Sequence, residues 1–317
     1  MRLPLQVIMQ HYSSFDEAPS SPVWLTIGVF DGVHLGHQAI LQRLVEGARK
    51  NSAASLVITF HPHPAVVLGK IDQPRYLTSP QERARLLGEA GVEMVITLPF
   101  TLQMASLSAE EFMRWVSSRF EIRQLLAGTD FALGKGREGN LQRLREIGQQ
   151  LGYELQVVEP IVLHGERISS SLIRDHLQKG EVRQAARLLG RYYRIGGSVI
   201  HGDGRGKELG YPTANVQFWE EQLLPAGGVY ATWAWVNDER HPAVTNLGFR
   251  PTFDQQSLRP HLETHLLNFR GDLYNQPLTL EFVQHLRPEI RFPSVNALVE
   301  QVNKDMKTAE EVLNHAP

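Results

Sequence analysis

Hydrophobic runs alternate with amphipathic stretches from residue 23 to about residue 182 of the 317-residue chain. Short apolar runs predict buried strands, and apolar positions recurring every three or four residues predict helices. Strands separated by such helices form βαβ units in a mostly parallel sheet, so this part is expected to be α/β. The expected strands are Val23–Phe30, Ser55–Phe60, Met94–Pro99, Leu125–Gly128 and Glu154–Val158, and the expected helices are Gly36–Asn51, Ser79–Ala90, Ser108–Phe120 and Gly139–Leu151.

Two of these helices carry clear start signals. Ser79 precedes Pro80, which places a capping residue before a proline at the first helical position. Ser108 is followed three residues later by Glu111, the spacing of a capping box. Both signals predict that the helices begin at these serines.

The pattern changes near residue 190. Gln178–Leu189 predicts one more helix, with Gly180 as a possible break near its start. Five or six short strands without intervening helices then predict an antiparallel barrel or sandwich, and the stretch from Val295 predicts a closing amphipathic helix. We therefore expect two domains, residues 1–186 and 187–317. The expected strands of the second are Arg194–Ile200, Val229–Val236, Ala243–Leu247, Leu262–Phe269 and Leu278–Val283.

Composition narrows the class of protein. With 42% hydrophobic and 21% charged residues, the chain has the composition of an ordinary globular protein. A formal net charge of −2 argues against a dedicated partner of nucleic acid or membrane surfaces. The absence of cysteine excludes disulfides and thiolate metal sites and fits a reducing compartment. Without a signal-peptide pattern or an apolar run near the ~20 residues of a membrane span, we expect a cytoplasmic enzyme or binding protein.

The first candidate site is the stretch Thr26–Gln38, in which an apolar run leads into an Asp-Gly turn and then a helix. His34 and His37 fall at the start of that helix, where unpaired N–H groups and the helix dipole favour a phosphate. Two imidazoles there can stabilise the charge that develops on a leaving pyrophosphate. Gly32 and Gly36 permit close approach of backbone and substrate. A metal pair or two surface histidines is the alternative, which the strand–loop–helix setting disfavours.

Two further segments have candidate roles beside this loop. Ser169, Ser170 and Ser171 fall at a predicted helix start, with Arg174 one turn later, so they form either a phosphate clamp or an ordinary helix cap. His61 and His63 alternate with prolines after a predicted strand. We interpret that segment as a rigid loop lining the cleft, without a ligand role, although a metal pair has the same spacing.

The second candidate site lies in the β-rich half. The glycine-rich segment 201–210 fails both the P-loop and the dinucleotide templates, and it is either a phosphate-wrapping loop or a simple hairpin. Thr213 and Asn215 follow two residues apart, so both can face one side of an extended chain and offer hard oxygen ligands to Mg²⁺. Glu263 interrupts an apolar strand. It is either exposed on an edge or a general base in a polar cavity.

At this point both halves resemble one family. The segments G-V-F-D-G-V-H-L-G-H and R-I-S-S-S-L-I-R, with T-F-H-P-H-P and G-T-D-F-A-L-G-K-G between them, are similar to the adenylyltransferase module of bacterial bifunctional riboflavin kinase/FMN adenylyltransferases, also called FAD synthetases. The segments G-D-G-R-G-K-E-L-G-Y-P-T-A-N, N-L-G-F-R-P-T-F and L-E-T-H-L-L-N-F resemble the riboflavin kinase domain. Ser171 stands where threonine is usual, and Ala132-Leu133 replaces a more common arginine-phenylalanine pair.

The resemblance implies a Rossmann-like nucleotidyltransferase domain, followed by an antiparallel β-barrel kinase domain with a closing helix. It implies that riboflavin is phosphorylated to FMN and that FMN is adenylylated to FAD, with ATP and Mg²⁺ as co-substrate and cofactor. Small molecules would be the only partners, apart from self-association, which the family allows. In the first domain it implies ATP contacts at Phe30, Asp31, Gly32, His34, Gly36, His37, Ser170, Ser171 and Arg174, and FMN contact at Asp130.

In the kinase domain the resemblance implies ATP contacts from the glycine-rich segment 201–210 and from Thr213 and Asn215. Thr213 and Asn215 would also hold the Mg²⁺ of the nucleotide, and Glu263 would activate the ribityl 5′-hydroxyl. The expected catalytic residues of the whole chain are thus Glu263, His34 and His37. The expected ATP contacts of the kinase are Gly204, Gly206, Gly210, Thr213 and Asn215.

Overall fold

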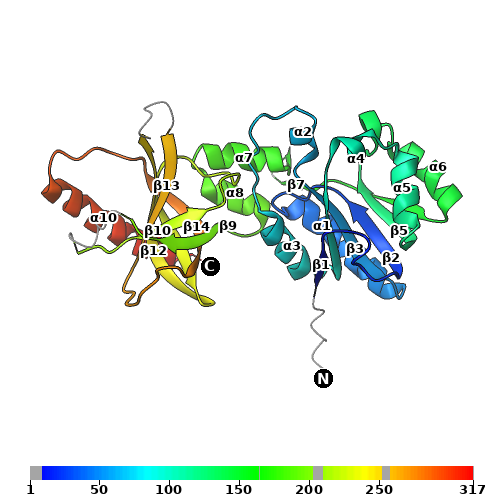
Figure 1. Cartoon of the computed structure of the whole chain (residues 1–317). Helices are drawn as coiled ribbons and strands as arrows, with labels where there is room; N and C mark the ends of the chain where they lie inside the picture. Colours follow the sequence, from blue (N-terminus) through cyan, green and yellow to red (C-terminus); the bar gives the residue numbers. More distant parts are fainter. Residues whose placement is uncertain (1–8, 164, 203–209, 252–257, 317) are drawn as a thin grey trace, which may run out of the picture. The chain divides into compact units, whose positions relative to one another are not determined.

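The computed structural model describes residues 9–163, 165–202, 210–251 and 258–316. Contacts within the chain divide it into two compact units, Met1–Ser170 and Ser171–Pro317 (Figure 1). Each is described separately below. None of the helices in the described ranges is long and apolar enough to cross a membrane.

The first unit is built on six parallel strands in the order β1-β4-β3-β2-β5-β6 (Figure 1). This confirms the expected α/β sheet. Its helices bury apolar residues against either face: α1 and α3 share one hydrophobic core, and α5 and α6 share the other. The strands are β1 (Gln10–Tyr12), β2 (Pro22–Ile27), β3 (Ala54–His61), β4 (Met94–Pro99), β5 (Glu121–Gly128) and β6 (Glu154–Val158), and the four helices are α1 (Leu35–Lys50), α3 (Pro80–Glu89), α5 (Ala109–Ser117) and α6 (Leu141–Leu151).

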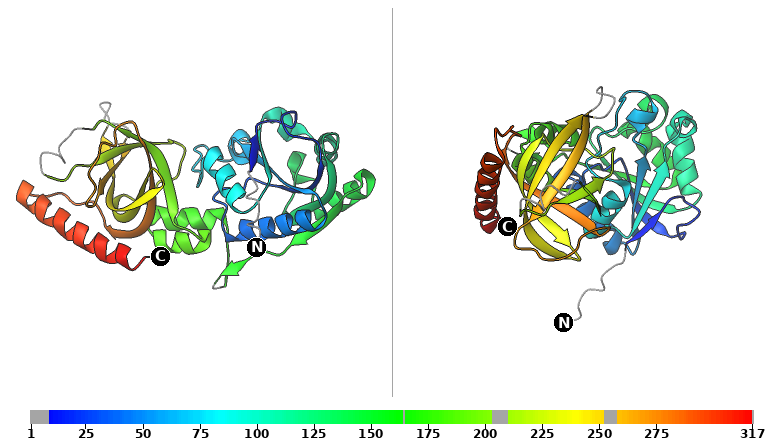
Figure 2. Two further views of the ribbon diagram at one scale, coloured as in Figure 1. Left: turned by 90° about the horizontal axis from the view of Figure 1, so that it is seen from below. Right: turned by 60° about the vertical axis from the view of Figure 1, so that its left-hand side comes forward.

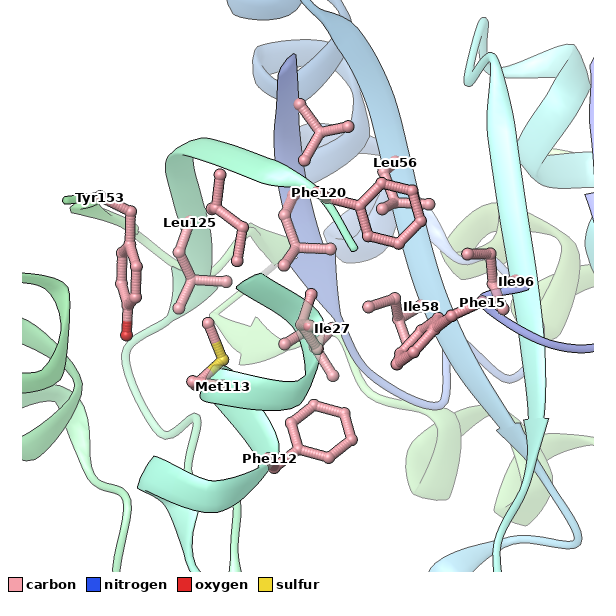
Figure 3. Close-up of a cluster of buried hydrophobic side chains, with 14 of the residues drawn as sticks. Phe15, Ile27, Leu56, Ile58, Ile96, Phe112, Met113, Phe120, Leu125 and Tyr153 are labelled. Carbon is pink, nitrogen blue, oxygen red and sulfur yellow. The ribbon is translucent and has the colours of Figure 1, made fainter. Parts of the chain in front are cut away.

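Strand alternation separates these two cores. On β3, Leu56 and Ile58 belong to the core beneath α5 and α6, whereas Val57 belongs to the core beneath α1 and α3. Figure 3 shows Phe112 and Met113 of α5 extending toward strand residues in the first of these cores. Because both faces are covered, the central strands β2, β3 and β4 consist largely of apolar residues, as expected for a buried parallel sheet.

The order of the strands indicates where a ligand is expected to bind. The chain runs from β2 outward through β3 to β4 and then crosses back, so that β5 pairs with the opposite side of β2. In open parallel sheets, ligands bind at the carboxyl ends of the strands where the order reverses in this way. The loop between β2 and α1 begins at this point.

Shorter elements complete the first unit, and the capping predictions hold. Ser79 Oγ accepts the Glu82 N–H at 3.1 Å at the start of α3. The capping box of Ser108 and Glu111 begins α5. The remaining elements are the helices α2 (Pro64–Val67) and α4 (Leu102–Ser106), the 3₁₀ turn η1 (Lys135–Arg137), and the hairpin of β7 (Val162–Leu163) with β8 (Glu166–Arg167).

The second unit is a closed antiparallel barrel with strand order β10-β13-β12-β11-β14-β9, which selects the barrel over the sandwich. Two helices precede it, and α10 lies along its outer side (Figure 2). Gly180, with φ 77°, separates the two preceding helices, so a single helix from Gln178 does not form. The elements are α7 (Ser170–Gln178), α8 (Val182–Leu189), β9 (Tyr193–Ile200), β10 (Ala214–Phe218), β11 (Gly228–Val236), β12 (Glu239–Pro251), β13 (Leu258–Leu266), β14 (Pro277–Arg287) and α10 (Val295–Asn314).

The barrel interior contains a short polar chain. Thr232, Thr245 and Thr264 come from three neighbouring strands and are completely buried. Their hydroxyl oxygens are 2.7 Å apart between Thr232 and Thr245 and 2.9 Å apart between Thr245 and Thr264. These buried hydroxyls are thus paired with one another, which offsets the cost of removing them from water.

The outer face of the barrel carries α10. The guanidinium of Arg287 on β14 donates to both oxygens of the buried Asp305 carboxylate on α10, at 2.7–3.0 Å. Gln301 adds a hydrogen bond to Asp305 at 2.9 Å. Breaking such a buried, bidentate pair is costly, so the pair fixes the position of α10 on the barrel.

Candidate functional site

The loop that follows β2 has an unusual backbone. The strand ends at Ile27, three residues earlier than predicted, because the chain then turns through positive φ values. Phe30 has φ 51°, Gly32 has φ 82° and Val33 has φ 39°. Positive φ is ordinary for glycine but costly for phenylalanine and above all for β-branched valine. Contacts from the surrounding chain must therefore hold this loop in place.

Asp31 supplies several of those contacts. Its carboxylate, which is 2% exposed, accepts the Leu77 N–H on both oxygens at 3.0 Å and the Thr78 N–H at 3.1 Å. The Thr78 hydroxyl lies 3.2 Å from both the Asp31 carboxylate and the Gly32 N–H. The carboxylate thus supports the loop from the protein side. Ser170 Oγ donates to the Asp31 carbonyl at 2.9 Å, which brings the first of the predicted clamp hydroxyls to this loop.

His34 and His37 come together at the start of α1. His34 is the N-cap, and its Nδ1 accepts the His37 N–H at 3.3 Å. The two imidazole rings stack with centroids 3.6 Å apart, and the rings of Phe30 and His37 meet edge to face with centroids 5.1 Å apart. Because Nδ1 of His34 is the acceptor, the neutral ring carries its proton on Nε2, which is then a hydrogen-bond donor. A Cβ on Gly36 would stand 3.1 Å from the His34 ring, so glycine leaves room for this ring.

Ser171 and Arg174 follow Ser170 on α7. Arg174 lies four residues after Ser170 and therefore on the same side of the helix, one turn further along. That spacing suits a hydroxyl and a guanidinium that contact one polyphosphate.

Asp130 forms an ion pair that the sequence did not suggest. Arg167 of β8 donates to its carboxylate at 2.7 Å, and Arg137 donates to its backbone carbonyl at 2.8 Å. The Arg167 hydrogen bond lowers the pKa of the Asp130 carboxyl below its usual value. The pair is largely exposed, with 68% of the Asp130 side chain accessible, so its partners can exchange when a ligand binds.

The histidines of the H-P-H-P segment have structural contacts. His63 Nδ1 accepts the Ala65 N–H at 2.9 Å and caps α2, while the His63 N–H donates to the Tyr76 hydroxyl at 2.7 Å. His61 packs its ring against Tyr76, with centroids 5.5 Å apart. Among the described residues, no group of three His, Cys, Asp or Glu side chains could hold a metal ion.

Strand register assembles the second site. Asn215 on β10 pairs directly with Glu263 on β13, and Glu263 pairs with Asn246 on β12. Alternate residues of these strands, such as Ala214 and Thr264, are buried in the barrel, so the paired polar residues share its outer face. The Glu263 side chain is 22% exposed on a strand with neighbours on both sides. It is therefore neither an exposed edge residue nor a deeply buried one.

Thr213 and the glycines surround this row of polar residues. Thr213, half-buried, directly precedes β10, and His265 Nδ1 lies 2.7 Å from the Pro212 carbonyl just before it. A Cβ on Gly202 would stand 2.1 Å from Nδ2 of Asn215, so this glycine gives the amide its space. Gly210 has φ 87° and open space around it. Gly204 and Gly206, predicted to contact ATP, lie outside the described residues.

Three residues near the sites were missed from the sequence. His261 Nε2 lies 4.0 Å from the Glu263 carboxylate, and Asn246 stands beside Glu263 on β12. Period-two alternation from Glu263 identifies His261 as a neighbour on the same face. In the first unit, Arg83 is completely buried beneath the β2–α1 loop and hydrogen-bonds the Val29 carbonyl at 2.9 Å. The sequence feature that could have identified it is its position as a charged residue on the apolar side of the predicted helix Ser79–Ala90.

Comparison with known proteins agrees with this division into two sites. A family model described as FAD synthetase matches residues 16–172, and one described as riboflavin kinase matches residues 189–313. A bifunctional riboflavin kinase/FMN adenylyltransferase from Listeria monocytogenes is 35% identical over 94% of this chain and 95% of its own. The corresponding protein from Pseudomonas fluorescens is 40% identical over 90% of this chain and 91% of its own.

The chain belongs to the bifunctional riboflavin kinase/FMN adenylyltransferase family. The family member from Escherichia coli is 36% identical over 94% of this chain and 95% of its own. A crystal structure of a protein named as a macrolide-efflux protein from Streptococcus pneumoniae has a TM-score of 0.86 and 28% identity, covering 96% of this chain and 99% of that one. That likeness concerns the fold, and the efflux in the name refers to that protein. The loop that carries His34 and His37 lies in the range matched by the FAD synthetase model, and the Asn215–Glu263 pair lies in the range matched by the riboflavin kinase model.

Proposed function

We propose that the chain makes FAD from riboflavin in two ATP-dependent steps, the first on the outer face of the barrel and the second at the β2–α1 loop. The observation that carries this proposal is the direct pairing of Asn215 on β10 with Glu263 on β13. These two residues offer oxygen atoms suited to a kinase site, and the same chain also has the stacked His34–His37 pair. Neither pair alone accounts for both products.

In the first step the ribityl 5′-hydroxyl of riboflavin attacks the γ-phosphorus of ATP, and ADP leaves. Glu263 takes the hydroxyl proton as general base. Thr213 and Asn215 offer a hydroxyl and an amide oxygen on the same outer face, a hard donor set that fits Mg²⁺. When bound with the nucleotide, Mg²⁺ neutralises charge on the phosphate oxygens. Gly204, Gly206 and Gly210 supply backbone N–H groups to the phosphates in this proposal.

In the second step a phosphate oxygen of FMN attacks the α-phosphorus of ATP, the bond from that phosphorus to the bridging oxygen of the β-phosphate breaks, and pyrophosphate leaves. The Nε2–H of His34, the ring of His37 and the N-terminus of α1 stabilise the developing charge. Ser170, Ser171 and Arg174 bind the polyphosphate. Phe30, Asp31, Gly32 and Gly36 shape the loop that contacts ATP. The exposed Asp130 carboxylate contacts FMN after exchange of its Arg167 partner.

We keep the functional boundary at residues 186 and 187. It falls between the two matched ranges, which end at residue 172 and begin at residue 189. By contacts, α7 and α8 group with the barrel, and the Ala226 N–H donates to the Leu177 carbonyl at 2.9 Å. The proposed partners are small molecules only, and the cysteine-free composition supports a cytoplasmic location.

The proposal is tested by incubating the chain with riboflavin, ATP and Mg²⁺ and separating the flavins by chromatography. FMN and FAD should both form, and the absence of any flavin product would contradict the proposal. Omitting Mg²⁺ in the presence of a chelator should stop FMN formation.

Labelled ATP distinguishes the two phosphorus centres. With riboflavin as substrate, label from the γ-phosphate should appear in FMN. With supplied FMN, label from the α-phosphate should appear in FAD, and γ-label should leave with pyrophosphate. A chain that binds flavin without catalysis would transfer neither label. A nucleotidyltransferase with another acceptor would leave riboflavin unchanged.

A further inference from the structure

Arg83 is the largest fully buried side chain of the described residues, with no exposed surface. It lies on α3, four residues after the Ser79 cap, among apolar neighbours of the same helix. A guanidinium keeps its charge at any pH a protein survives, and burying one costs several kcal/mol unless its donors are satisfied. A buried guanidinium of this kind is expected to stabilise a particular arrangement of the groups around it.

The contacts of Arg83 show what it holds. Its Nη1 donates to the carbonyl of Val29 at 2.9 Å, to the carbonyl of Phe60 at 3.2 Å and to the hydroxyl oxygen of Thr59 at 3.2 Å. The Thr59 hydroxyl itself donates to the Val29 carbonyl at 2.9 Å. One nitrogen therefore ties together the carboxyl ends of β2 and β3, and the Val29 carbonyl receives two of these hydrogen bonds.

Val29 directly precedes the first strained residue of the phosphate loop. Phe30 and Val33 keep positive φ values that cost about 1–3 kcal/mol each and persist only where the surroundings fix them. Downstream of Phe30, Asp31 and Gly32 are held by Leu77 and Thr78. The upstream hold comes from Arg83 and Thr59, so the loop is fixed on both sides of its strained residues.

We propose that Arg83 is a positioning residue for the adenylylation step, acting through the Val29 carbonyl on the loop that places His34 and His37. This inference rests on the proposed function of that loop. Without the guanidinium, the Phe30–Val33 turn can relax toward ordinary backbone angles and displace the histidines. Displacement of catalytic groups by about 1 Å can cost on the order of 10²-fold in rate.

The test compares Arg83→Met with Arg83→Lys and with the matched control Arg85→Met. Methionine has similar length and no donor, whereas lysine restores a cation with three donors. Arg85 lies on the same helix but is partly exposed and pairs with Glu82 and Glu89. We expect Arg83→Met to lower kcat for FAD formation from FMN by about 10- to 100-fold, with the KM for ATP changed much less. Lysine should recover part of the loss, and Arg85→Met should stay within twofold of the unchanged chain.

Riboflavin phosphorylation by the same samples reports on the second unit and should not change, and the fraction of chains with a folded first unit is measured by urea unfolding. A kcat for FAD formation within twofold of the unchanged chain, per folded Arg83→Met molecule, would overturn the inference. Should that variant not fold, Thr59→Val provides a second arm, because it removes one hydrogen bond to Val29 and one acceptor of Arg83 while the Val29 and Phe60 carbonyls still accept from the guanidinium. That variant should lower kcat severalfold, and an unchanged kcat would also overturn the inference. If the unchanged chain itself makes no FAD, the proposed function fails instead.

Discussion

The two candidate sites of this chain are built in different ways. At the adenylyltransferase loop, the positions of His34 and His37 depend on a backbone with positive φ values. Hydrogen bonds from buried side chains, such as Asp31 and Arg83, keep that backbone in place. At the kinase site, Asn215 and Glu263 face each other because antiparallel register and strand alternation leave them no other position. We therefore predict that activity at the first site is sensitive to substitution of supporting residues such as Asp31 and Arg83. At the second site we predict sensitivity mainly to substitution of the residues proposed to contact substrate.

The largest expected effects come from removing the reacting groups themselves. Glu263→Ala should lower FMN formation by about 10²–10⁴-fold, the usual worth of a general base, while FAD formation from supplied FMN continues. His37→Ala should do the opposite, lowering FAD formation by about 10²–10³-fold so that FMN accumulates. Both are measured by flavin chromatography. If either variant abolished both activities equally, the division between two independent sites would be wrong.

The next largest effect distinguishes a residue that supports a loop from a residue proposed to act directly at a site. Asp31→Asn replaces an acceptor-only carboxylate with an amide that also carries donors, which leaves buried N–H groups of Leu77 and Thr78 poorly paired. We expect a loss of about 1–3 kcal/mol in unfolding free energy together with reduced FAD formation. The matched change at the kinase site, Asn215→Ala, should abolish most FMN formation with a stability change within about 0.5 kcal/mol. Urea unfolding gives the unfolding free energy of each variant, and the FMN and FAD assays give its activities. Equal destabilisation by the two substitutions would contradict the proposed difference between the two sites.

A smaller effect is expected from a glycine beside the kinase register pair. Gly202→Ala places a methyl group 2.1 Å from the present position of Asn215 Nδ2, so the amide must move. We expect FMN formation to fall by about tenfold, with FAD formation from supplied FMN unchanged. Gly196→Ala on β9 is the control, because its methyl group would meet only Thr279 Oγ1 at 3.3 Å. Similar activities of the two variants would show that Asn215 tolerates displacement.

The smallest effect concerns pH and the barrel itself. Burial lowers the pKa of His285 on β14 below its usual value, partly offset by a hydrogen bond with the Arg287 backbone. Below about pH 6.5 the unfolded chain binds a proton that the folded chain resists, so this residue makes the barrel less stable as pH falls. The protection factors of β11 and β14 amides, that is, their exchange rates relative to an unfolded chain at the same pH, should thus fall on acidification. His285→Gln should remove that part of the pH dependence, and an identical pH profile would contradict this role.

Much of the architecture was predictable from apolar pattern alone. Met94–Pro99 and Glu154–Val158 were predicted with the bounds that β4 and β6 have. β4 is a largely apolar run buried in the sheet, whereas β6 is an edge strand whose apolar residues alternate with Glu154 and Gln156. The end of β2 was predicted three residues too late, since the positive φ values of Phe30 and Val33 leave no mark in an apolar sequence. β10 was missed as a strand, because its outward residues Asn215 and Gln217 interrupt the apolar run.

The candidate sites divide along the same line. His34, His37 and Glu263 were predicted because their residue types suit the chemistry at those points of the fold, and their roles stay predictions. Arg83 was missed, although it lies three and four residues before the buried Leu86 and Leu87, because a charged residue within a helical pattern normally indicates the solvent side. Its role depends on carbonyl groups from two other strands, which only the folded chain brings to one point. Supporting residues are thus harder to predict than reacting ones.

The threonines inside the barrel have a consequence for substitutions at any one of them. The Thr245 hydroxyl donates to Thr264, and the Thr232 hydroxyl lies within reach of both Thr245 Oγ1 and the Ala243 carbonyl. Replacing one threonine therefore changes the hydrogen-bond partners of its neighbours. The stability effects of substitutions at these three positions should thus be non-additive.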